Sequence, residues 1–255
     1  MLELTFTRLA GGDNSRRLLV VGPSLGTSVE ALWGECARLL APEWEVVGWD
    51  LPGHGRSGPA LSPFTIDDLA DAVRGFSADL ARDRPTAYAG VSVGGAVGFQ
   101  LTLDPGPFAA TVAIASAPKI GQTSDWLERA ELVRRAGTPV LVAGSVLRWF
   151  APGFTDRAPR TVDTLLRSLS DTDKFSYAWV CEALAYFDLR DQLVRGRVPV
   201  AVMAGGHDQV VTPELARTAT GTAHVLQSCA HLPPAEDPAA TAELLTTLLS
   251  AKAAL

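Results

Sequence analysis

Six apolar runs alternate with helix-like segments along the 255-residue chain, and this alternation most constrains its fold. The runs are rich in valine and alanine with few polar breaks, which is typical of strands buried on both faces of a parallel sheet. Alternating strands and helices predict an α/β fold whose central sheet is open, mostly parallel and flanked by helices. The expected strands are 17–22, 45–50, 85–91, 111–116, 198–205 and 223–228, and the expected helices include 28–40, 65–82, 93–103 and 212–220.

Local signals mark the ends of several elements. The N-terminal sequence LELTFTR alternates, so we expect an antiparallel edge strand that forms a hairpin with a neighbour. Thr65 and Asp68 have the spacing of a capping box at the start of a helix. Asp237 followed by Pro238 predicts the N-cap and first residue of the last helix.

One interval breaks the alternation. Between Ser116 and Val198 the only strand-like run is the doubtful segment 138–144. A crossover between parallel strands needs only a dozen or so residues, so this interval is much too long for one. We therefore expect a helical cap inserted over residues 119–190. The surrounding core would consist of residues 1–118 and 191–255.

Composition and charge exclude several classes of protein. The formal net charge of −6 argues against a nucleic-acid partner, because binding phosphates requires a basic face. No apolar run approaches the roughly 18 residues that span a membrane, and the N-terminus lacks the pattern of a signal peptide. The cysteines, Cys36, Cys181 and Cys229, show neither disulfide nor metal-ligand spacing. We expect a cytoplasmic protein without a metal site or a membrane partner.

A possible nucleophile lies in the segment Gly90–Gly94, which reads Gly-Val-Ser-Val-Gly. This is the G-x-S-x-G pattern of a nucleophile elbow, in which small residues let a strand turn sharply into a helix and expose the serine. The alternative is an ordinary glycine-rich turn. A strand is expected before Ser92 and a helix after it, as the elbow requires, so we predict Ser92 as a nucleophile.

A serine needs a base, and the chain has four histidines. His54 lies in a tight turn and suits a structural role, His207 is next to an aspartate at a strand end, and His224 begins a strand. His231 lies in a loop just after the last expected strand, at the edge of the sheet where catalytic groups collect. It also fits the chain order serine, acid, histidine that accompanies this elbow, so we predict His231 as the base.

The base in turn needs a carboxylate to orient it. Asp208 follows the expected strand 198–205 and lies between Ser92 and His231 in the chain. The alternative is a turn aspartate that caps the next helix, although Thr212 suits that role better. Asp188 and Asp191 are fallback candidates inside or near the cap.

An oxyanion formed at the substrate carbonyl would need backbone N–H donors. The Val93 N–H, directly after the nucleophile, is one expected donor. The second is expected from the loop after strand 17–22, where Leu25 occupies the corresponding position. Pro23 has no N–H group and is excluded as a donor.

These segments together resemble the α/β-hydrolase superfamily, through GPSLGTS, DLPGHGRS, GVSVGG, GGHDQVVTPE and AHLPPAEDP in the same order. Segments in and around the cap, among them VLRWFAPGF and CEALAYFDLRDQL, are most similar to the 3-oxoadipate enol-lactonases. The resemblance implies opening of an enol-lactone during breakdown of aromatic compounds, without a cofactor. Pro23 and Val93 depart from residues common in the family, but neither removes a required donor.

The small anionic lactone that this resemblance implies would need a cation for its carboxylate. Arg148 is our candidate, with Trp149 and Trp126 as apolar walls; the alternative is a surface arginine above two core tryptophans. Arg129, Arg134 and Arg135 compete, but their spacing suits an exposed helix face. Rival functions are those of a carboxylesterase, a C–C bond hydrolase, a cofactor-free perhydrolase or a non-catalytic binding protein. The sequence does not determine the oligomeric state.

Overall fold

Seven strands form one sheet in the order β1-β3-β2-β4-β5-β6-β7 in the computed structural model, which describes residues 2–12 and 15–252. Only β1 is antiparallel to its neighbour, and the other strands run parallel. The α/β fold predicted from the sequence is thus confirmed. The strands are β1 (Thr5–Ala10), β2 (Arg17–Gly22), β3 (Trp44–Asp50), β4 (Thr86–Val91), β5 (Phe108–Ile114), β6 (Val200–Gly205) and β7 (His224–Leu226).

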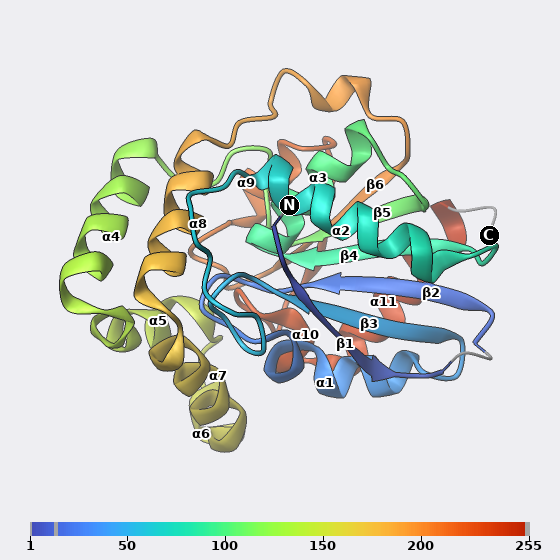
Figure 1. Cartoon of the computed structure of the whole chain (residues 1–255). Coiled ribbons are helices and arrows are strands. Elements are labelled where there is room, and N and C mark those ends of the chain that lie inside the picture. The colour runs from blue at the N-terminus through green and yellow to red at the C-terminus, as the bar shows by residue number, and fades with distance from the viewer. Residues whose placement is uncertain (1, 13–14, 253–255) are drawn as a thin grey trace.

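Helices cover both faces of the sheet, which is why its central strands are almost wholly apolar (Figure 1). On one face lie α1 (Val29–Leu40) and α11 (Pro238–Lys252), which pack against each other. On the other face lie α2 (Ile66–Ala81) and α3 (Val93–Leu103), also in mutual contact. Within the described part of the chain, no helix combines the length and apolar character needed to span a bilayer.

Side-chain caps set where several helices begin. Thr65 and Asp68 form the predicted capping box, in which each side chain accepts from the other residue's backbone N–H. Asp237 accepts a hydrogen bond from the Ala240 N–H at the start of α11, as predicted. The Ser28 hydroxyl similarly accepts from the Ala31 N–H at the start of α1.

Five helices lie between β5 and β6 in the chain and gather at the carboxyl ends of the parallel strands (Figure 1). Their largest contact joins the first and the last of them. The helices are α4 (Thr123–Ala136), α5 (Val142–Trp149), α6 (Phe154–Arg157), α7 (Pro159–Asp171) and α8 (Lys174–Tyr186). Short elements follow them, namely η2 (Leu193–Arg195), α9 (Pro213–Arg217) and α10 (Pro233–Glu236). The division into a cap at 119–190 and a core stays a prediction.

Two details differ from the sequence-based expectation. The segment 138–144 is not a strand but a 3₁₀ turn, η1 (Thr138–Leu141), that leads into α5. From the end of η1 through α5, the buried residues Leu141, Ser145 and Trp149 recur every four positions, which is a helical period. The N-terminal strand is an antiparallel edge, as expected, but it pairs with β3 rather than with the next strand in sequence, so it forms no hairpin.

The order of the strands in the sheet has a switch point between β2 and β4. From β2 the chain continues to β3 on one side, and then crosses to β4 on the other side of β2. Strands β2 and β4 are parallel neighbours, yet the helix after β2 lies on one face and the helix after β4 on the other. Ligands in open α/β sheets bind in the crevice outside the carboxyl ends of the strands at such a switch point. The loops after β2 and β4 are therefore placed to form a site.

The turn between β4 and α3 should not tolerate a side chain at Gly90. A Cβ atom there would overlap the carbonyl of Gly94, which belongs to the backbone of α3. We expect Gly90→Ala to lower the free energy of unfolding by about 1–3 kcal/mol, measured by urea denaturation.

Gly34, in the middle of α1, is the matched control because a Cβ there meets no atom within 4 Å. Gly34→Ala should raise the free energy of unfolding by roughly 0.5–1 kcal/mol, since alanine favours a helix. Equal effects of the two substitutions would contradict the assigned role of Gly90.

Candidate active site

Ser92 occupies the sharp turn between β4 and α3 in a strained backbone conformation. Its φ of 55° and ψ of −113° lie in a region that residues other than glycine rarely adopt. Three hydrogen bonds hold the turn: the Ser92 N–H donates to the Ile114 carbonyl at 2.8 Å, the Ser116 hydroxyl donates to the Ser92 carbonyl at 2.8 Å, and Gly94 N–H donates to the Pro23 carbonyl at 3.0 Å. This geometry is that of the predicted nucleophile elbow.

His231 and Asp208 are in direct contact. His231 Nδ1 lies 2.9 Å from Asp208 Oδ2, and both side chains are buried. The other carboxylate oxygen of Asp208 accepts from the backbone N–H groups of Val210 at 2.7 Å and Val211 at 3.0 Å. The carboxylate is thus fixed and in turn orients the imidazole. The fallback residue Asp188 instead forms a surface ion pair with Arg190.

Ser92 and His231 line the same cavity, which has a volume of about 250 Å³. Because Nδ1 of His231 is engaged by Asp208, Nε2 is the imidazole nitrogen left for the serine. The cavity is lined both by loops at the sheet edge and by residues of the helices that lie between β5 and β6 in the chain. The structure therefore brings three of the predicted residues to one place.

The other histidines lie elsewhere. His54 is buried, with Nδ1 2.9 Å from the Pro52 carbonyl, and burial lowers its pKa to about 4. It is therefore a neutral structural residue, in line with the sequence analysis. His207 and His224 are exposed. Of the four, His231 alone lines the cavity that contains Ser92.

The predicted oxyanion donors are the backbone N–H groups of Leu25 and Val93. Leu25 lines the cavity, and Val93 is the first residue of α3, so its N–H has no partner inside that helix. Within the described residues, neither N–H donates a hydrogen bond to the protein. Reciprocal hydrogen bonds between Ser24 and Thr27 fix the loop that carries Leu25. Two unengaged donors beside Ser92 are suited to binding a developing negative charge.

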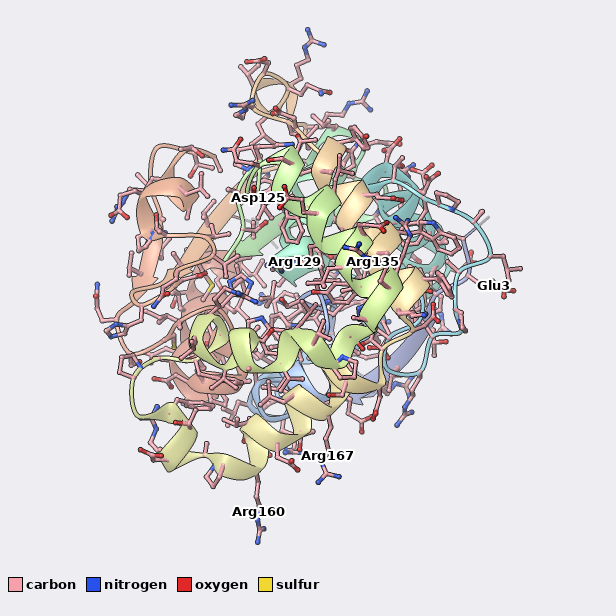
Figure 2. The ribbon with its side chains drawn as sticks, turned by 90° about the vertical axis from the view of Figure 1, so that its left-hand side faces the viewer. Glu3, Asp125, Arg129, Arg135, Arg160 and Arg167 are labelled. Atoms are coloured by element: carbon pink, nitrogen blue, oxygen red, sulfur yellow. The ribbon has the colours of Figure 1, made fainter. Side chains whose placement is uncertain are left out.

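The predicted substrate-binding residues Arg148, Trp149 and Trp126 all line this cavity. Arg129 lines it as well, so the expectation that this arginine belongs to an exposed face of its helix was wrong. Figure 2 shows Asp125 and Arg129 over the middle of the molecule, whereas Arg160 and Arg167 project away from it. The missed signal is the spacing of Trp126 and Arg129, which places both on one face of α4.

Two positive charges, Arg129 and Arg148, line the cavity together with the exposed carboxylate of Asp125. Among the described residues, no carboxylate forms an ion pair with Arg129 or Arg148. The Arg129 guanidinium lies 5.1 Å from the Trp126 ring centroid, and its positive charge opposes the rise that burial causes in the pKa of Tyr177. Burial, reinforced by the positive charge of Arg129, lowers the pKa of Arg148. Such a pair of guanidinium groups favours binding of an anion.

Side chains that could ligate a metal ion do not cluster in the described part of the chain. The part of the chain that the structure describes contains no group of three or more His, Cys, Asp or Glu residues arranged to hold a metal ion. Cys36, Cys181 and Cys229 are free and buried in separate places, and burial raises the pKa of each thiol to about 12. They are therefore suited to packing rather than to metal ligation.

Comparison with known proteins agrees with this geometry. The family model described as "Alpha/beta hydrolase family" matches residues 18–244. The chain is 35% identical to 3-oxoadipate enol-lactonase 2 of Acinetobacter baylyi over 202 residues, which cover 79% of this chain and 75% of that protein. It is 30% identical to 3-oxoadipate enol-lactonase 1 of the same organism, with the same coverage. The crystal structure of the enol-lactonase from Burkholderia xenovorans LB400 superposes with a TM-score of 0.90 at 26% identity, covering 97% of this chain and 96% of that one.

A fluorophosphonate probe should form a covalent adduct at Ser92, because a serine beside a base attacks electrophilic phosphorus. Asp208→Asn should slow the labelling by about 10³–10⁴-fold, since an amide stabilises the wrong tautomer of His231. Labelling is followed by mass spectrometry of the peptide that contains residue 92. Ser92→Ala should remain unlabelled.

Asp188→Asn is the matched control, because that carboxylate pairs only with the exposed Arg190 and should not affect labelling. If Asp208→Asn were labelled as fast as the control, Asp208 would not orient the base.

Proposed function

The chain is a hydrolase that belongs to the alpha/beta hydrolase family, and on that premise we propose that it opens 3-oxoadipate enol-lactone to 3-oxoadipate. The observation that carries the proposal is one small cavity lined by Ser92, His231 and two arginines that form no ion pair among the described residues, with one carboxylate, Asp125, also in the lining. The first pair of residues suits acyl transfer, and the arginines suit a substrate with a carboxylate. The reaction would serve the breakdown of aromatic compounds, as in the family that the sequence resembles.

In the first half of the reaction Ser92 attacks the lactone carbonyl. Nε2 of His231 takes the hydroxyl proton, and Asp208 stabilises the imidazolium that forms. The N–H groups of Leu25 and Val93 bind the oxyanion of the tetrahedral intermediate. The intermediate collapses with cleavage of the bond between the acyl carbon and the ring oxygen. The His231 imidazolium gives its proton to the enolate that leaves, which becomes the ketone, and His231 is neutral again.

In the second half of the reaction water releases the product. The acyl group is attached to Ser92, and His231 now activates a water molecule that attacks the same carbonyl. The oxyanion again occupies the site formed by Leu25 and Val93. Collapse of this second intermediate returns the proton to Ser92 and frees the carboxylic acid. Each step uses only side chains and backbone groups of this protein, so the proposal includes no cofactor.

The carboxylate on the lactone side chain is assigned to Arg148 and Arg129. Arg148 belongs to α5 and Arg129 to α4, so both come from the helices between β5 and β6. The other part of the lining, with Ser92 and His231, comes from loops at the sheet edge. Trp126 and Trp149 are each less than a tenth exposed and form apolar walls beside the two arginines. A neutral ester would leave both guanidinium groups without an ion-pair partner, whereas the carboxylate of the lactone can accept hydrogen bonds from them. The charge of the cavity thus favours the anionic lactone over a simple carboxylic ester.

The remaining predictions belong to the same proposal. Residues 119–190 act as a cap that supplies the substrate-binding side chains, and residues 1–118 and 191–255 supply the catalytic ones. The cytoplasmic location expected from the sequence also stays a prediction. A non-catalytic binding protein would not need the buried contact between His231 and Asp208 in the same cavity as the strained turn at Ser92.

The proposal predicts that the purified protein consumes 3-oxoadipate enol-lactone, followed by loss of the enol-lactone absorbance and by acid release. Ser92→Ala should lower the rate by about 10³-fold or more. Efficient cleavage of neutral aryl esters with no turnover of the lactone would instead indicate a carboxylesterase. Diketone or peroxide-dependent substrates in the same panel test the C–C hydrolase and perhydrolase alternatives.

Removing either cavity arginine should harm the anionic substrate selectively. Arg148→Ala and Arg129→Ala should each lower kcat/KM for the lactone by roughly 10–100-fold, the loss expected for hydrogen bonds to a charged group. The same variants should change kcat/KM for a neutral aryl ester by less than about 3-fold. The measurement is steady-state kinetics on both substrates.

Arg135 is the matched control on α4, because its side chain is exposed and pairs with Glu131. Arg135→Ala should leave both substrates unaffected. Equal losses on the lactone and the ester in the cavity variants would remove the arginines from the carboxylate site.

A further inference from the structure

We propose that Glu236 is a positioning residue. Its buried carboxylate binds both the loop that carries His231 and the segment after helix α5, and so fixes the position of one relative to the other. The inference rests on the proposed function, because it concerns the placement of His231 and of the substrate-binding residues on α5. Glu236 does not line the cavity that contains Ser92 and therefore acts through the backbone of other residues.

The carboxylate binds the backbone on both sides of His231. Its Oε1 atom accepts hydrogen bonds from the N–H groups of Ala230 at 2.9 Å and Leu232 at 3.1 Å. Only 6% of Glu236 is exposed, so these bonds are shielded from water. Two bonds from one oxygen to the residues before and after His231 restrict the position of that loop. The contact between His231 and Asp208 depends on this restriction.

The second oxygen binds the inserted helices. Oε2 accepts from the Ala151 N–H at 2.7 Å, two residues after the end of α5. A further bond joins the same two segments, because the His231 N–H donates to the Trp149 carbonyl at 3.1 Å. Helix α5 carries both Arg148 and Trp149. The distance from the base to the carboxylate-binding wall is therefore set by Glu236 together with one backbone bond.

The charge of Glu236 is stabilised where it lies. Burial raises the pKa of this carboxyl group, while the three N–H donors and the nearby His231 act in the opposite direction. A buried carboxylate without such partners would be strongly destabilising. Three charge-assisted hydrogen bonds to backbone groups of two separate segments make it a stiff connection.

Glutamine and alanine should break this connection in different ways. The amide of glutamine keeps one acceptor oxygen, which can serve Ala230 and Leu232, but it presents an N–H₂ group to the Ala151 N–H. The reverse orientation would oppose two donors instead of one and is therefore less favourable. Glu236→Gln should thus release α5 and retain the base loop. Glu236→Ala removes all three acceptors and should release both.

The experiment compares three variants with the native protein on two substrates and one probe. Glu236→Gln should raise KM for the anionic lactone by roughly 10-fold, as for one lost charged hydrogen bond. Its kcat for a neutral aryl ester and its rate of fluorophosphonate labelling at Ser92 should stay within about 3-fold of the native values. Glu236→Ala should slow labelling and kcat on both substrates by about 10²-fold, the loss expected for a misplaced catalytic group.

Asp237→Asn is the matched control. Asp237 caps α11 and accepts from the Ser228 hydroxyl, and asparagine keeps the cap while removing the same charge one residue away. It should leave all three measurements unchanged. Identical profiles for Glu236→Gln and Asp237→Asn would overturn the inference. So would a Glu236→Ala protein whose melting temperature falls but whose folded fraction is labelled at the native rate.

Failure of the proposed function would look different. If the native protein were labelled at Ser92 and cleaved aryl esters but did not consume the lactone, the lactone assignment would be wrong. The labelling rates of Glu236→Ala and Glu236→Gln would still decide whether Glu236 positions the base.

Discussion

The parallel pairing of β2 with β4 is the constraint on which the rest of the site depends. The register places Gly22 opposite Gly90, so both strands end at the same height and their loops emerge side by side. The helices that follow lie on opposite faces of the sheet, which opens the space between the two loops. One loop presents the Leu25 N–H and the other presents Ser92 and the Val93 N–H. The positions of the predicted nucleophile and of its predicted oxyanion donors therefore follow from the strand order. Glycine is needed at positions 22 and 90 because a Cβ atom there would overlap neighbouring atoms.

Buried carboxylates fix the loops that emerge from this sheet edge. Asp50, at the end of β3, accepts from the N–H groups of Val29 and Arg56 and so ties the start of α1 to the loop after β3. Asp208 and Glu236 bind backbone N–H groups in the same way near His231. Burial raises the pKa of Asp50 and of Glu236, and backbone donors stabilise their charged forms in compensation. Loops carry unsatisfied N–H groups, so an acceptor with two oxygens is an effective way to hold them without regular structure.

The sequence predicts most of the fold because the buried parallel strands are recorded as continuous apolar runs, and because capping residues such as Thr65 and Asp237 act locally. The proximity of Asp208 and His231 was predictable for a related reason, since both follow strands whose carboxyl ends meet at one edge. Segment 138–144 was misread because a valine-rich run of that length suits either a strand or a helix, and only the absence of a neighbouring strand decides.

Arg129 and Glu236 were missed for lack of tertiary information. A helix-face argument treats α4 as if it stood alone, and Glu236 acts through backbone N–H groups that no side-chain pattern records.

The cavity is lined by two arginines, although the protein as a whole carries a negative net charge. With a formal net charge of −6, the long-range field does not attract an anion, so affinity for one must arise from groups at short range. Arg129 and Arg148 supply that local charge, and each lies in a half-buried wall where a missing counter-ion is costly. Arg134, on the same helix as Arg129, does form an ion pair, with Glu182. Under the proposed function, the carboxylate of the substrate would be the partner of Arg129 and Arg148, and its binding would stabilise the folded protein.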